Sequence, residues 1–184
     1  APGGVAPRLS AATLTWPDAS SAARAPRGGA LLPAFGAALH AALLSGAMSR
    51  VFEMTLQYCN DRMQFGKSLG KFQAVQHQLS VMAEHTAAAS MAAEAAFQGA
   101  GKAPSLLAAA MAKSRTCEAA GLVASIAHAL HGAIGVTEEY DLQLLTRRLH
   151  EWRMTHGSEA CWNKVVGEQV LAGTLSIVDF VRSV

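Results

Sequence analysis

Apolar residues recur at helical spacing along the chain from residue 30 onward. In a first helix, predicted over residues 31–61, one stripe carries Leu44, Met48, Val51, Thr55 and Tyr58. Glycines and a proline interrupt the pattern after it. Further helices are predicted over residues 72–98, 104–131, 138–154 (beginning at Glu138 or Glu139), 159–171 (capped by Ser158) and within 175–184. Long helices joined by short loops favour an all-α, up-down helical bundle.

Residues 1–29 differ from the rest and are predicted to form a linker. Proline and glycine punctuate this segment, and only residues 9–16 (LSAATLTW) alternate enough to predict a short strand. A single strand cannot form a sheet, so any partner strands would lie elsewhere. We therefore place the helical bundle domain at residues 30–184.

The composition narrows the classes of function. The 184 residues are 51% hydrophobic and 15% charged, with a net charge of +2, and no basic cluster indicates nucleic-acid binding. Cys59, Cys117 and Cys161 are widely spaced, which predicts neither a disulfide framework nor a metal motif. The chain does not begin with a basic segment followed by an apolar stretch, so no signal peptide is expected. A reduced, cytoplasmic protein is the expectation.

Two charge-free stretches, residues 28–49 and 119–137, approach the length of a bilayer span. Glycines and histidines interrupt both, and Pro33 interrupts the first. Helices buried inside a bundle are also apolar nearly all round. We interpret these stretches as bundle helices and expect no membrane span.

Residues 62–73 (RMQFGKSLGKFQ) carry the most distinctive chemistry in the chain. An arginine grips a phosphate through two parallel hydrogen bonds, and a neighbouring aromatic ring can lie against a flat heterocycle. The glycines allow the backbone to approach a ligand closely. Arg62 at a helix end could also simply complement the helix dipole. The string as a whole favours a nucleotide-contact loop.

Three segments together resemble the C-terminal helical domain of the acyl-CoA dehydrogenase family. Residues 58–66 are similar to its Y-x-x-x-R-x-Q-F-G segment, and residues 72–82 match F-Q-x-x-Q-x-x-L-A-x-M. Residues 131–140 (HGAIGVTEEY) look like the family's H-G-G-x-G-y-T-x-E, and Arg147 and Arg148 fall where the family often carries R-R. The resemblance covers residues 31–171. In that family a middle β domain precedes this bundle, so residues 9–16 would be a remnant of it.

The resemblance implies a flavoprotein that oxidises acyl-CoA thioesters, the substrates of fatty acid metabolism, with FAD as hydride acceptor. In the family the R-x-Q-F-G loop contacts FAD bound mainly by a neighbouring subunit. Arg62 would pair with the pyrophosphate, and Gln64 and Phe65 would lie beside the adenosine portion. The residues expected to line the same surface are Leu69, Phe72 and Gln73.

A second cofactor contact is implied at the turn from Gly132 to Gly135. Its backbone N–H groups would point toward the ADP part of FAD, assisted by a helix start at Glu138. Two departures weaken this contact: Ala129 replaces the family's glutamine, and Ala133 replaces its second glycine. The family assembles as dimers of dimers, so a homo-oligomer (dimer or tetramer) is expected.

The position of the family's catalytic base carries no carboxylate here. Most members place a glutamate in an E-G-T segment, and the corresponding residues are His156, Gly157 and Ser158. A minority place it on the first helix of the domain, at the position of Gly36. An imidazole titrates near neutrality, so His156 is the candidate base; the alternative is a packing or helix-capping histidine.

Two further interpretations stay open. The chain could be a non-catalytic subunit in a hetero-oligomer with a catalytic acyl-CoA dehydrogenase subunit, in which Arg62, Gln64 and Phe65 complete the partner's FAD site. It could also be a structural bundle without flavin.

His128 and His131 lie one helical turn apart, but no third ligand is suitably spaced, so no metal site is predicted. A solvated or inter-subunit face is expected for Glu151, Arg153 and Glu159.

Overall fold

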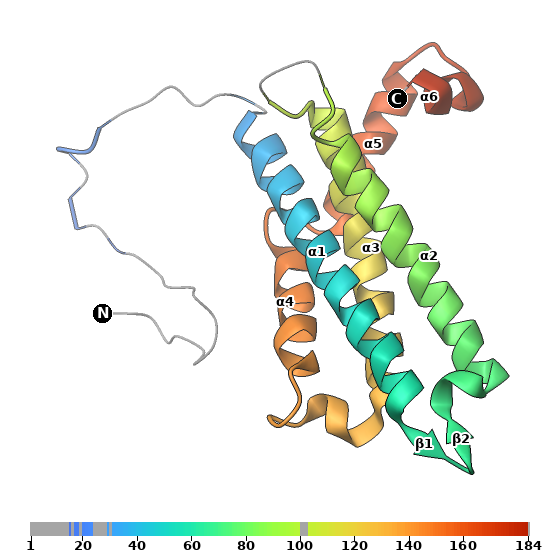
Figure 1. Cartoon of the computed structure of the whole chain (residues 1–184). Helices are drawn as coiled ribbons and strands as arrows, with labels where there is room; N and C mark the ends of the chain where they lie inside the picture. The colour runs from blue at the N-terminus through green and yellow to red at the C-terminus, as the bar shows by residue number, and fades with distance from the viewer. Residues whose placement is uncertain are drawn as a thin grey trace.

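The structure is a computed structural model in which residues 15, 17–18, 20–23, 29, 31–99 and 103–183 are described. Six helices make up most of that part of the chain, which confirms the expected all-α bundle (Figure 1). They are α1 (Leu31–Asp61), α2 (Gln73–Ala95), α3 (Leu106–His131), α4 (Leu142–Met154), α5 (Glu159–Ala172) and α6 (Ile177–Ser183). Of the strand predicted over residues 9–16, only Thr15 is described, so that prediction lies outside the described residues.

The three longest helices, α1, α2 and α3, run side by side with alternating direction (Figure 1). Helix α3 is central, because it packs against α1, α2, α4 and α5. Helix α4 covers α1 and α3 on one side, and α5 continues along α3 toward α6. This arrangement puts the turn between α4 and α5 next to the N-terminal half of α1.

The core consists of two clusters with different side-chain sizes. One cluster contains the larger residues, among them Leu44, Met48, Val51, Met82, Val123, Leu142 and Leu149. The other lies near the N-terminus of α1 and is almost entirely alanine, with Trp162 of α5 as its one aromatic residue among those described. Alanine has the highest helix propensity and a small side chain, so it allows helices to approach closely. Trp162, only 4% exposed, fills the space that these small residues leave.

Two predicted helix boundaries and one predicted cap were wrong. Helix α2 ends at Ala95 rather than at residue 98, because a turn precedes Gly99. Helix α4 begins at Leu142 and not at Glu138 or Glu139, because residues Gly132–Val136 form a 3₁₀ helix, η2, followed by turns. Ser158 is the N-cap residue of α5, but its hydroxyl makes no capping hydrogen bond. By contrast, Ser105 caps α3, since its hydroxyl oxygen accepts from the Ala108 N–H at 3.0 Å.

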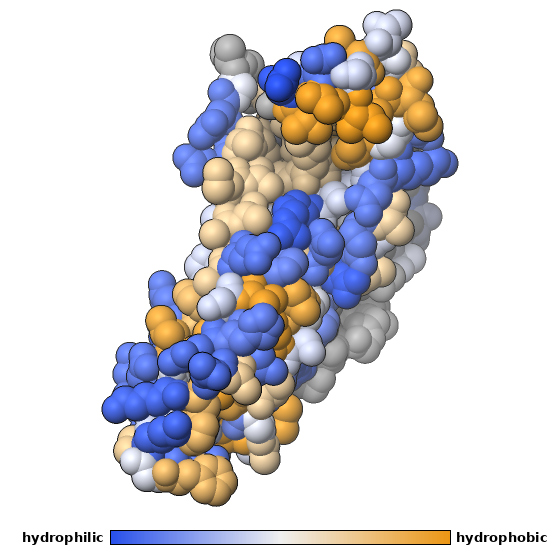
Figure 2. All heavy atoms as spheres, turned by 90° about the vertical axis from the view of Figure 1, so that its right-hand side faces the viewer, coloured by the Kyte–Doolittle hydropathy of each residue, from blue (hydrophilic) through white to orange (hydrophobic). Residues whose placement is uncertain are grey.

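Exposed apolar side chains gather at the end of the molecule that carries α5 and α6 (Figure 2). They are Leu171, Leu175, Ile177, Val178 and Val181. Two segments, Leu31–Asp61 and Leu106–Val136, are long and apolar enough to cross a bilayer by length and composition. Within these segments, 50% and 39% of the most apolar stretch is buried in the bundle. Core helices of a bundle satisfy the same criteria.

The buried imidazole of His131 links the ends of α1 and α3 and makes stability depend on pH. Burial lowers its pKa below the ordinary value of 6.5, whereas the hydrogen bond that its ring donates to the Ala127 carbonyl raises the pKa. The unfolded chain therefore binds this proton first as the pH falls, so the free energy of unfolding decreases below about pH 6.5. We expect this histidine alone to contribute up to about 1.4 kcal/mol per pH unit.

Urea unfolding at pH 7.5 and pH 5.5 measures this effect. His131→Phe should reduce the difference between the two pH values, whereas His77→Gln, on the exposed surface of α2, should leave it unchanged. An equal pH dependence in the His131 variant and the wild type would contradict the expectation.

Candidate functional site

The end of α1 carries a small hairpin that presents an aromatic ring to solvent. Strand β1 (Met63–Gln64) pairs antiparallel with β2 (Lys67–Ser68), and Phe65 and Gly66 form the two-residue turn between them. Both turn residues have positive φ, 49° and 77°, as a type I′ turn requires. Glycine adopts this conformation freely, but a bulky residue does so only at a cost. Phe65 is nevertheless 91% exposed, so a strained backbone holds its ring largely in solvent.

The predicted flavin-contact residues surround this hairpin. Arg62, Gln64 and Gln73 are exposed, and the Arg62 side chain makes no ion pair within the described part of the chain. The Arg62 backbone is fixed, because its N–H donates to the Tyr58 carbonyl and its carbonyl accepts from the Leu69 N–H, each at 2.9 Å. The structure thus holds an available cation at a rigid backbone position.

Leu69 and Phe72 are half-buried at the base of the hairpin. Leu69 begins the 3₁₀ helix η1 (Leu69–Lys71), which leads into α2. The Lys67 ammonium lies 4.1 Å from the centre of the Phe72 ring, and the rings of Phe65 and Phe72 meet edge to face at 6.3 Å. A face of positive and aromatic character results, of a kind that can bind phosphate and a flat ring.

The turn after α3 lies at the same end of the bundle. The Tyr58 ring stacks on the His131 ring at 4.4 Å, and the Tyr58 hydroxyl donates to the His131 carbonyl at 3.4 Å. Gly132 follows directly, with φ of 65° and an exposed position. The two segments predicted to contact FAD are therefore brought together, although far apart in sequence.

Gly135 differs from Gly132 because it is buried. A Cβ on Gly135 would lie 2.9 Å from the His131 Cβ and 3.1 Å from Leu142, so the glycine is required by packing between η2 and α4. The helix start expected at Glu138 does not exist, since α4 begins at Leu142. The predicted dipole assistance at Glu138 was therefore wrong, and contact of Gly132 and Gly135 with ADP stays a prediction.

The neighbouring histidines of α3 each bond through one ring nitrogen to an atom of this chain. The Nδ1 atom of His131 bonds to the Ala127 carbonyl at 2.8 Å, and the Nε2 atom of His128 lies 2.8 Å from the Thr146 hydroxyl. No group of three or more potential metal ligands occurs among the described residues. The packing interpretation is consistent with both contacts.

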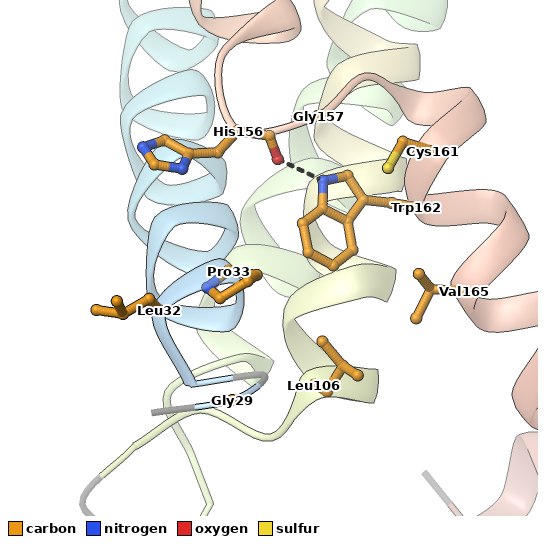
Figure 3. Close-up of a pocket in the computed structure, with 9 residues that line it drawn as sticks. All are labelled: Gly29, Leu32, Pro33, Leu106, His156, Gly157, Cys161, Trp162 and Val165. Atoms are coloured by element: carbon orange, nitrogen blue, oxygen red, sulfur yellow. Dashed lines mark hydrogen bonds between the residues drawn. The ribbon is translucent and has the colours of Figure 1, made fainter. Parts of the chain in front are cut away.

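His156 lies at the opposite end of α1, in the tight turn between α4 and α5 (Figure 3). His156 and Gly157 both have positive φ, 57° and 97°. The Trp162 indole N–H donates to the His156 carbonyl at 2.9 Å, which ties the turn to the buried face of α5. A Cβ on Gly157 would lie 2.7 Å from that indole nitrogen, so only glycine fits between turn and ring.

An ion pair also closes this turn. The Arg153 guanidinium binds the Glu159 carboxylate, with Nε at 3.0 Å from Oε2. This pairing lowers the pKa of Glu159 and raises that of Arg153. Glu151, Arg153 and Glu159 are half-buried and paired within the chain, so the expectation of a solvated or inter-subunit face for them stays a prediction.

The His156 ring fills the space beside Gly36 on α1. A Cβ on Gly36 would lie only 2.4 Å from His156 Nδ1, so the ring lies where a side chain at position 36 would begin. The two positions predicted by resemblance for the base thus lie side by side, although they are 120 residues apart in sequence. Only one of them can carry a large side chain, and here it is position 156.

A cavity of about 720 Å³ opens beside His156. Its walls come from α1, α3, α5 and the turn, with the residues Gly29, Leu32, Pro33, Leu106, His156, Gly157, Cys161, Trp162 and Val165 (Figure 3). Apolar walls with a few polar groups at one point are typical of small-molecule sites. Among the lining residues, His156, the exposed Cys161 and Trp162 carry polar side-chain atoms, and the Trp162 indole N–H already donates to the His156 carbonyl (Figure 3).

Two residues of this region were missed from sequence alone. His40, one helical turn after Gly36, lies with its ring centre 4.9 Å from that of His156. Lys113 of α3 is fully buried and bonds to the last carbonyls of α4, just before the His156 turn. A histidine spaced four residues from Gly36 was a signal for the first. Nothing in the pattern around Lys113 indicates its contact with α4, about 40 residues away in sequence.

The fit between Gly36 and His156 predicts an asymmetry between two glycines of α1. Glycine to alanine inside a helix ordinarily stabilises by about 0.5–1 kcal/mol. Gly46→Ala should show this gain, because a Cβ there meets no described atom within 4 Å. Gly36→Ala should not increase the free energy of unfolding in this way, because its Cβ would displace the His156 ring. Urea unfolding and the ¹H–¹⁵N signals of His156 measure both effects; identical behaviour of the two variants would contradict the packing.

Comparisons with known proteins agree with these features. The family model for the acyl-CoA dehydrogenase C-terminal domain matches residues 34–171. Acyl-CoA dehydrogenase IpdE2 of Mycolicibacterium smegmatis is 38% identical over 114 residues, covering 62% of this chain and 35% of that protein. The chain therefore spans about a third of the length of such relatives.

Solved structures show the same arrangement of helices. Butyryl-CoA dehydrogenase from Megasphaera elsdenii matches with a TM-score of 0.71 at 27% identity, covering 77% of this chain and 38% of that one. A glutaryl-coenzyme A dehydrogenase in complex with glutaryl-CoA matches with a TM-score of 0.70 at 26% identity, covering 78% of this chain and 37% of that one. The chain belongs to the acyl-CoA dehydrogenase family and carries its C-terminal helical domain.

Proposed function

We propose that this chain provides the helical domain of an FAD-dependent enzyme that introduces an α,β double bond into acyl-CoA thioesters, with His156 as the base. The observation that most directly supports this proposal is the position of the exposed His156 ring. The ring lies where a side chain at position 36, the family's alternative base position, would begin. The turn that holds the ring is tied by Trp162 and by the Arg153–Glu159 pair. A base held in one place by its surroundings is what proton abstraction requires.

The chemistry assigned to His156 is removal of the acyl α-proton. The Cα–H bond breaks, the proton passes to the unprotonated ring nitrogen, and the electron pair stays with the substrate. FAD, when bound, accepts the hydride that leaves the β-carbon. A positioned general base typically contributes about 10²–10⁴-fold to the rate.

The residues at the hairpin fit a flavin dinucleotide. Arg62, whose guanidinium makes no ion pair with the described residues, would bind the pyrophosphate, and the exposed Phe65 ring would lie against the adenine. Gln64 and Gln73 offer amide groups on the same exposed face. This donor set supports the proposal that FAD is the cofactor.

The flavin-contact residues and the base lie far apart in one chain. Gly36 and Arg62 are separated by most of the 31-residue α1. A rise of ~1.5 Å per residue puts them about 39 Å apart, more than the diameter of a small domain. We infer that the hairpin of one chain and His156 of the same chain serve different sites. Each complete site then requires a second chain, in a homo-oligomer or a hetero-oligomer.

Arg62 gives a direct test of the cofactor contact. Arg62→Met should weaken FAD binding about tenfold to a hundredfold, because a hydrogen bond to a charged group contributes about 1.5–3 kcal/mol. Flavin fluorescence titration of the purified protein measures the dissociation constant. Lys71→Met, which removes another exposed cation near the hairpin, is the matched control and should bind FAD normally. Equal affinity in both variants would contradict the contact.

One observation favours a second function, a non-catalytic subunit that completes a partner's flavin site. Neither Gly36 nor His156 supplies the carboxylate that family members use. Reduction of the flavin by acyl-CoA in an anaerobic spectrophotometer decides between the two. The dehydrogenase predicts bleaching of the yellow colour by the wild-type protein. The non-catalytic subunit predicts no bleaching, with activity gained in His156→Glu.

A further inference from the structure

Two imidazoles meet at the end of α1 that carries Gly36. The ring centres of His40 and His156 are 4.9 Å apart, and the ring planes are tilted by 49°. The Nδ1 atom of His40 lies 2.9 Å from the Gly36 carbonyl oxygen. Since a carbonyl oxygen can only accept, Nδ1 must carry the proton, which leaves Nε2 as the lone-pair nitrogen of a neutral ring. One backbone bond therefore selects the tautomer of His40.

The groups around the pair disfavour a second positive charge. Burial lowers the pKa of His40; the Gly36 carbonyl raises it, and charge on His156 and Lys113 lowers it further. Lys113 approaches from α3, and its ammonium bonds to carbonyls of α4 rather than to a carboxylate. The carboxylate of Glu159 on α5 is paired with Arg153 of α4. No carboxylate contacts either imidazole among the described residues.

We propose that His40 and His156 act as a coupled pair, in which His40 is the neutral positioning residue of His156 and charge on one ring disfavours charge on the other. The fixed tautomer of His40 keeps its ring packed against His156 without adding charge. The coupling is a property of the two rings, and only its use in proton abstraction rests on the proposed function.

Titration of the histidine ring nitrogens by ¹H–¹⁵N NMR tests the coupling without substrate. In His156→Phe the neighbouring charge is removed while a ring still covers His40, and we expect the His40 midpoint to rise by about one pH unit. The backbone tolerates phenylalanine at positive φ in this chain, as Phe65 shows. His156→Asn is the second variant, since asparagine adopts the left-handed conformation readily, and it should also raise the midpoint.

The coupling of His40 and His156 can be tested separately from the proposed role of His156 as the base. His77→Phe, on the exposed surface of α2, should leave the His40 midpoint unchanged. An unchanged His40 midpoint in both His156 variants would overturn the coupling. The acid limb of kcat/KM should fall tenfold per pH unit, as for uptake of one proton; a hundredfold fall per unit would overturn it. Turnover that survives His156→Ala while the coupling is observed supports the pair and removes only the base assignment.

Discussion

Replacing His156 by alanine is expected to lower kcat by about 10²–10⁴-fold while leaving the protein folded, because a positioned general base contributes a factor of this size. The side chain is exposed, so its removal opens no cavity in the core. Acyl-CoA contacts made by the rest of the site should persist, and KM should change less than kcat. Stopped-flow measurement of flavin reduction reports the step directly.

The matched control for this substitution is His150→Ala. His150 is an exposed histidine of α4, six positions before His156, and it does not line the cavity. We expect wild-type turnover in this variant. A His156→Ala protein that reduces flavin as fast as the wild type would remove His156 from the chemistry and leave the non-catalytic subunit as the better proposal.

Lys113→Met is expected to lower the free energy of unfolding by about 2–5 kcal/mol, because it leaves buried acceptors without donors. The Lys113 ammonium is fully buried and donates to the carbonyls of Trp152 and Arg153, at 2.8 and 3.1 Å, and to Cys117 Sγ at 3.0 Å. It also complements the negative end of the α4 dipole. Methionine matches the length of lysine but supplies no N–H group, so the Trp152 carbonyl loses the Lys113 donor, while the Arg153 carbonyl keeps the Cys117 thiol at 3.3 Å.

Urea unfolding followed by circular dichroism measures this loss. Lys164→Met is the control, because Lys164 is exposed on α5 and pairs only with Glu168 at 3.7 Å. Such surface changes ordinarily alter stability by less than about 0.5 kcal/mol. We also expect Lys113→Met to broaden the His156 ring signals, since the carbonyls it releases directly precede the turn. Equal stability of the two variants would show that the buried ammonium is dispensable.

The helices were predictable from sequence because their apolar spacing and their glycine punctuation agree. The first helix was predicted over residues 31–61, and α1 spans Leu31–Asp61. The start of α4 was not predictable in the same way, because Glu138 and Glu139 look like first-turn residues of a helix. Packing of Gly135 against His131 and Leu142 instead favours a 3₁₀ helix there and delays α4 to Leu142.

The sequence predicted which residues belong to the candidate site, but not which of them lie next to one another. Family resemblance singled out Gly36 and His156 separately, and nothing in the pattern indicated that one ring occupies the other's side-chain space. That contact depends on how α4 ends, which in turn depends on the buried Lys113. The Arg153–Glu159 pair was missed for the same reason, since helical spacing does not describe a tight turn. Tertiary contacts across such turns carry no periodic signal.

Subunit complementation tests most directly whether each site is shared between chains. Arg62→Met and His156→Ala, each weakly active alone, would be mixed under conditions that exchange subunits, and flavin reduction by acyl-CoA would be recorded. If the hairpin and His156 of one chain serve different sites, mixed dimers contain one intact site, and about a quarter of wild-type activity should return. If both residues serve the same site, every mixed site is damaged and no activity returns, which would contradict the separation along α1.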